Sequence, residues 1–204
     1  MSGLPDGPYG IAWSPLRHTA ARCRVLALGV LLAASLLIAA CGPIGGSQPI
    51  QSAVLGGTQA AFTARYGAPA HLTAFGPLYL VSIQGTAIAL NLIEVKGVDG
   101  QAHVSAVGVL PPGSDATWDN ATASKVSAPF VPSDAQLVSD MPGTNGTLHI
   151  YRSAALAATF SADLFVKATD HTLVAPGTFT IACESLYPSQ AIPICLLRVG
   201  VFDR

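Results

Sequence analysis

The sequence contains very little charge. Only 10% of its 204 residues are Asp, Glu, Lys or Arg, and the formal net charge is −1. From Cys41 onward, the chain keeps seven basic and ten acidic residues, so the net charge there is −3. Binding to nucleic acid needs a basic patch or stripe, and this balance argues against such a partner. Half of the residues are hydrophobic, which also argues against an intrinsically disordered chain.

The common catalytic and cofactor motifs are also missing. The chain has no G-x-S-x-G, H-E-x-x-H, C-x-x-C, P-loop or G-x-G-x-x-G sequence. Beyond residue 41 it has four histidines, and none lies within four residues of another: His71, His103, His149 and His171. No metal site or cofactor is therefore expected. An enzyme with an unfamiliar site is the least favoured hypothesis for the function.

One apolar run near the N-terminus has the features of a secretory signal peptide. Val25–Ala40 has 16 residues without a charge, follows Arg17, Arg22 and Arg24, and ends in small residues. A membrane-spanning helix needs about 20 apolar residues. A signal peptide over residues 1–40 is therefore favoured, and a signal-anchor is the alternative.

The residues that close this run, Ile38-Ala39-Ala40-Cys41, resemble the lipobox of bacterial lipoproteins. In that family the cysteine thiol receives a diacylglyceryl group, and the chain is cut just before it. The resemblance implies that Cys41 is lipidated. It also implies that the mature chain is extracytoplasmic, on the outer face of the cell membrane or of an outer membrane. Two acyl chains anchor stably, whereas one binds only marginally.

The remaining cysteines predict one disulfide. Cys183 and Cys195 are the only cysteines beyond Cys41, and an extracytoplasmic location permits disulfides. Neither has a histidine nearby, and their spacing matches no zinc pattern. Each lies on the more apolar side of an alternating segment, 178–183 or 195–201. A bridge between them is expected to hold a C-terminal hairpin together.

The first half of the mature chain predicts a tether, a short helix and a meander. Residues 42–57 are rich in Gly, Pro, Ser and Gln, which is typical of a flexible tether. Thr58 and Gly67 are suited to cap the two ends of a short helix. Three strand-like segments follow, with Asp99-Gly100 as one hairpin turn: 78–84, 86–96 and 101–110.

A second set of elements follows in the same order. Ser114 or Asp115 is expected to cap a helix that carries Trp118 and ends near Ala128-Pro129. Segments 135–141 and 147–153 predict another hairpin, and Ser153 is expected to cap a short helix after it. Residues 58–204 thus predict one α+β domain with antiparallel sheet. A division into two sub-units near 111–130 is the alternative.

The first unit resembles the small α+β envelope domains of the BamE and β-lactamase-inhibitor type. The likeness covers about 55 residues and depends on Gly56-Gly57-Thr58, Tyr66-Gly67 and Pro69. It implies protein binding rather than catalysis. The leading hypothesis is therefore a non-catalytic envelope module with a protein partner. The alternative is a lipoprotein that binds a small molecule or lipid, with aromatic side chains around a pocket: Tyr66, Tyr79, Trp118 and Tyr151.

Overall fold

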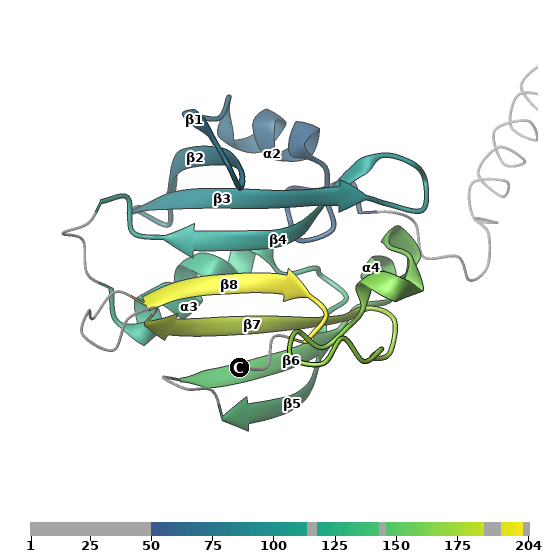
Figure 1. The fold of residues 1–204 in the computed structure, drawn as a ribbon. Helices are drawn as coiled ribbons and strands as arrows, with labels where there is room; N and C mark the ends of the chain where they lie inside the picture. The colour runs from purple at the N-terminus through teal and green to yellow at the C-terminus, as the bar shows by residue number, and fades with distance from the viewer. Residues whose placement is uncertain (1–49, 114–117, 143–145, 186–192, 202–204) are drawn as a thin grey trace, which may run out of the picture. The chain divides into compact units, whose positions relative to one another are not determined.

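The centre of the fold is one antiparallel sheet. The structure, a computed structural model, describes residues 50–113, 118–142, 146–185 and 193–201. They belong to one folded unit, which spans Ser47–Arg204. Over the described residues, eight strands form the sheet in the order β1-β2-β3-β4-β8-β7-β6-β5 (Figure 1).

The elements follow the expected order, although the sheet dominates. The strands are β1 (His71–Thr73), β2 (Gly76–Ile83), β3 (Thr86–Lys96), β4 (Ala102–Leu110), β5 (Gln136–Pro142), β6 (Thr147–Arg152), β7 (Thr178–Ser185) and β8 (Pro193–Val199). The helices are short: α2 (Gln59–Tyr66), α3 (Asn120–Ser127), α4 (Ala154–Thr159) and the 3₁₀ turns η1 (Ala128–Phe130) and η2 (Ala162–Leu164). The expected α+β class is therefore met only in its coarse outline, an antiparallel sheet with a few short helices.

Strand β8 joins the two halves of the sheet. Strands β1–β4 form one meander, and β5–β7 form a second antiparallel set. The last strand in sequence lies between them and pairs with β4 on one side and β7 on the other. The two helix-and-strand sets seen in the sequence are thus halves of one sheet.

One side of the sheet is buried in the core. Rows of paired residues cross the strands on this side, for example Tyr79, Leu90, Val109 and Cys195, and all four are buried. Helix α2 packs here through Phe62, and α3 packs through Ala123 and Val126. Alternation of apolar side chains along each strand directs them to this side.

The helix caps agree with the sequence at two of three helices. The Thr58 hydroxyl accepts a hydrogen bond from Ala61 N, and the Ser153 hydroxyl accepts one from Leu156 N. Helix α3 corrects the third expectation, because its cap is Asp119, whose carboxylate accepts from Thr122 N at 2.6 Å. Trp118 therefore precedes the helix. Ser114 and Asp115 lie outside the described residues.

The segment 50–57 packs into the core, although its composition is typical of a tether. Ile50, Ala53 and Leu55 are buried. Two backbone hydrogen bonds join the segment to β4, Gly56 N to Val104 O at 2.8 Å and Val104 N to Gly57 O at 2.7 Å. A Cβ at Gly57 would collide with the Ser52 carbonyl, so glycine permits this close approach. The folded unit therefore includes these residues.

A buried histidine links this segment by hydrogen bonds to the turn between β3 and β4. His103 Nδ1 lies 2.8 Å from Gly56 O, and Nε2 lies 3.0 Å from Asp99 Oδ2. The ring thus bridges a backbone carbonyl of the segment and a carboxylate of the turn. The hydrogen bond from His103, and then that from Gln101 N, hold the pKa of Asp99 below its ordinary value.

The Asp99 interaction predicts a pH-dependent contribution to stability. A carboxyl whose pKa falls on folding stabilises the fold above its unfolded pKa, about 4, and loses that contribution as pH falls through the lower folded value. We expect Asp99→Asn to be less stable than the wild type at pH 7, with a gap that narrows below about pH 5. Urea unfolding of both proteins from pH 7 to pH 3 measures the gap. A gap that is independent of pH would contradict this role.

The expected disulfide is present. Cys183 and Cys195 are bonded and are directly paired across β7 and β8. Cys195 is fully buried, and Cys183 is partly buried against the core. The bond links residues separated by 12 positions in the sequence.

Loss of this disulfide is expected to destabilise the fold. A bond that closes a loop of this length contributes about 3 kcal/mol in the chain-entropy description. The double variant Cys183→Ala/Cys195→Ala should unfold at lower urea than the oxidised wild type, and reduction of the wild type should reproduce most of the shift. Equal midpoints for all three samples would show that the bond has no stabilising role.

Candidate interaction surface

The side of the sheet opposite the core is open over β2, β3, β4 and β8. The register places one set of side chains there: Leu78, Leu80, Ala89, Asn91, Ile93, Ala106, Gly108, Leu110, Leu196 and Arg198. Residues paired across antiparallel strands share a face. We call this set the open sheet face. Figure 1 shows α3 behind the sheet and no helix in front of β3, β4 and β8.

The open sheet face is aliphatic and almost free of charge. Arg198 is its one charged member, and the others are aliphatic residues, a glycine and one asparagine. Leu80 is 54% exposed and Ile93 is 42% exposed, whereas their neighbours Tyr79 and Leu92 are fully buried. Within the open sheet face Ala89 and Ala106 are buried, and the other leucines are partly buried. Single exposed aliphatic residues are ordinary, but a contiguous apolar surface indicates an interaction site.

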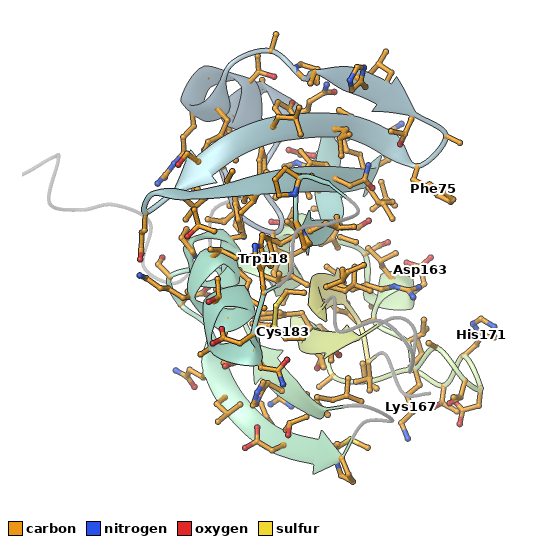
Figure 2. All side chains as sticks on the ribbon, turned by 90° about the vertical axis from the view of Figure 1, so that its left-hand side faces the viewer. Phe75, Trp118, Asp163, Lys167, His171 and Cys183 are labelled. Atoms are coloured by element: carbon orange, nitrogen blue, oxygen red, sulfur yellow. A yellow bond between two sulfur atoms is a disulfide. The ribbon has the colours of Figure 1, made fainter. Side chains whose placement is uncertain are left out.

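The loop that follows α4 turns one end of the open sheet face into a groove. A depression of about 420 Å³ lies between this loop and the sheet, lined on the sheet by Ile93, Ala106, Leu196 and Arg198 and on the loop by Asp163, Leu164 and Val166. Figure 2, which looks toward the ends of the strands, shows Phe75 and Asp163 on the right and Trp118 near α3. Phe75, in the turn between β1 and β2, is 74% exposed and does not line this groove.

A second groove lies on the α3 side, at the other end of the sheet. The α3–β6 groove has a volume of about 440 Å³, and its walls are α3 with the turn after it and strand β6, with β7 behind them: Asn120, Ser124, Ser127, Ala128, Val131, Thr147, His149, Tyr151, Ile181 and Cys183. At its rim His149 Nδ1 lies 2.7 Å from Asp140 Oδ1, and both side chains are largely exposed. The carboxylate accepts from Nδ1–H, so Nε2 is left for other partners.

The expected site residues are not gathered in one place. Cys41 lies outside the described residues. Of the four aromatic residues considered for a pocket, Tyr79 is fully buried in the core, Tyr66 packs against Phe62 and Phe130, and Trp118 packs against the core. Tyr151 alone among them lines the α3–β6 groove. An aromatic pocket of these four does not form.

The four histidines lie in different parts of the structure and differ in burial. His103 is buried in β4, His149 lies at the rim of the α3–β6 groove, and His71 and His171 are exposed. Among the described residues, no three His, Cys, Asp or Glu side chains approach closely enough to hold a metal ion. In the same part of the chain, no helix has the length and apolar character that crossing a membrane requires.

The open sheet face corresponds to a pattern in the sequence. The strands β3, β4 and β8 have apolar residues at most positions of both parities, and such near-continuous runs are typical of strands covered on both sides. One side is covered by the core, and on the other side η2 borders only the groove at one end of the open sheet face.

Comparison with known proteins gives no relative from which a function can be taken. No protein-family model, no curated protein and no solved structure matches the chain.

Two neighbouring residues of β3 test the difference between the two sides of the sheet. Leu92 is fully buried and Ile93 is on the open sheet face. We expect Leu92→Ala to lower the free energy of unfolding by about 2–5 kcal/mol, because it leaves a cavity in the core. Ile93→Ala should lower it by less than about 1 kcal/mol. Urea unfolding measures both, and equal losses would show that both sides are buried.

Proposed function

We propose that the protein is a lipid-anchored, extracytoplasmic binding module, without catalytic activity, whose partner is an envelope protein that docks on the open sheet face. The observation that carries the proposal is the contiguous aliphatic surface over four strands, in which Arg198 is the one charged residue. When a partner removes such a surface from water, the free energy of the complex falls, which favours binding.

The start of the folded unit limits where that partner can lie. The proposed anchor is Cys41, and the packed segment begins by Ile50, nine residues later. Even a fully extended chain of that length spans only about 30 Å. Lipidation of Cys41 would therefore hold Ile50 within about 30 Å of the membrane surface. We therefore propose that the partner is a protein of that membrane or one bound to it.

Binding is favoured over catalysis by the arrangement of the polar groups. The open sheet face offers one cation and, on the loop beside it, one carboxylate, Arg198 and Asp163. The Asp140–His149 pair is on the other side of the sheet. An acid, a base and a nucleophile within hydrogen-bond reach of one another are what nucleophilic catalysis requires, and the polar residues of the open sheet face do not include such a set.

Site-specific crosslinking in the native cells tests this proposal. A photo-crosslinking amino acid is placed at Leu80 on the open sheet face, and in a separate protein at Gln136 on β5, which is exposed at the far edge of the sheet. We expect a defined crosslinked product from position 80 and none of the same mass from position 136. Mass spectrometry of the product identifies the partner.

A matched pair of charged substitutions tests whether the crosslinked product depends on the open sheet face. Ile93→Asp puts a charge on the open sheet face, whereas Val138→Asp puts the same charge on an exposed aliphatic position of β5, 53% exposed. Ile93→Asp should abolish the product from position 80, and Val138→Asp should leave it unchanged. The proposal fails if both variants still give the product, or if position 80 captures nothing while the protein is folded and membrane-bound.

A further inference from the structure

The α3–β6 groove has walls whose chemistry differs from that of a helix packed on a sheet. A helix side that faces a sheet is normally apolar. Here Asn120, Ser124 and Ser127 follow one another at helical spacing along the side of α3 that lines the groove. Ser127 is nearly fully buried, and its hydroxyl donates to Ser124 O at 2.9 Å. Asn120 and Ser124 are exposed to solvent, and α3 packs against the core through Ala123 and Val126. The groove thus lies beside the packed side of the helix and is bordered there by short polar side chains.

The opposite wall is polar in the same way. Thr147, His149 and Tyr151 alternate along β6 and line the groove. The Asp140 carboxylate, 2.7 Å from Nδ1, fixes the orientation of the His149 ring. With Nδ1–H donated to Asp140, Nε2 of the neutral ring is an acceptor. The Tyr151 ring stacks on Phe179 with centroids 5.3 Å apart, which holds its position in the wall.

The floor and the charge of the groove narrow the class of ligand. Ile181 and Cys183 supply apolar surface behind the polar walls. None of the lining residues is Asp, Glu, Lys or Arg, and His149 already has the Asp140 carboxylate beside it. Apart from the Asp140–His149 pair at the rim, the lining residues present no charge with which a charged ligand could pair. A hydrocarbon chain would cover the polar side chains of Asn120, Ser124, Thr147 and Tyr151 without offering them hydrogen bonds.

We propose that the α3–β6 groove binds a neutral saccharide of one or two rings. Sugar hydroxyls both donate and accept, as do the Asn120 amide and the Ser, Thr and Tyr hydroxyls that face them. The C–H surface of a sugar ring matches the apolar floor. The volume, about 440 Å³, lies within the range of small-molecule sites. Because the groove is on the side opposite the open sheet face, a saccharide and a protein partner can bind at the same time.

Calorimetric titration of the full-length chain with three neutral disaccharides tests this inference: maltose, cellobiose and N,N′-diacetylchitobiose. Glucose 6-phosphate and glucosamine serve as charged comparisons. We expect at least one neutral disaccharide to bind, and both charged sugars to bind more weakly.

Substitutions locate the binding. Tyr151→Phe keeps the ring stack and removes the hydroxyl, and Asn120→Ala removes the amide. Each should weaken binding about fivefold to tenfold, the loss of one hydrogen bond. Ser82→Ala, at an exposed position of β2, is the control and should have no effect. The inference is overturned if none of the three disaccharides binds, if a charged sugar binds most tightly, or if neither groove variant weakens binding. Loss of the crosslinked partner would not affect this result, so the two proposals fail separately.

Discussion

The pairing of β8 with β4 and β7 is the interaction on which the rest of the structure depends. Without it, the chain would have a β1–β4 meander and a separate β5–β7 set, each with an additional open edge. Open edges are costly because their backbone groups lack partners. The last strand removes two such edges at once and brings Cys195 opposite Cys183. It also brings Leu196 and Arg198 beside Gly108 and Ala106, which extends the open sheet face across four strands.

The two sides of this sheet differ in burial and composition. The core side is filled by large apolar side chains and by α2 and α3, so it supplies the stability. The open side is lined with leucine, isoleucine, alanine and glycine, carries one charged residue, and is hollowed at one end by a groove. The α3–β6 groove occurs where the core ends and the side chains between helix and sheet become polar. A rigid sheet thus carries both surfaces in fixed positions.

The sequence predicted local elements well and long-range relations poorly. Strand-length apolar runs and the Asp99-Gly100 turn predict β2, β3 and β4, and alternation predicts the C-terminal hairpin, because both patterns are local properties of the sequence. The adjacency of β4 and β8 joins segments about 90 residues apart and leaves no local pattern. The Gly, Pro, Ser and Gln content of residues 42–57 predicts a tether, whereas residues 50–57 are part of the fold. Their apolar residues Ile50, Ala53 and Leu55 pack only because the rest of the fold offers them a site. The α3–β6 groove is lined by polar residues of α3 and β6. Their proximity depends on the fold and has no local pattern in the sequence.

Thiol labelling in intact cells tests the central claim most directly, because it reports location, exposure and occupancy of the open sheet face together. Ile93→Cys and Val138→Cys each place one free thiol at an exposed position, the first on the open sheet face and the second on β5. With a membrane-impermeant maleimide, the account predicts rapid labelling of both in the purified protein. In cells it predicts rapid labelling at 138 and strong protection at 93. Equal labelling of both sites in cells would show that the face is unoccupied, and no labelling at 138 would contradict an extracytoplasmic location.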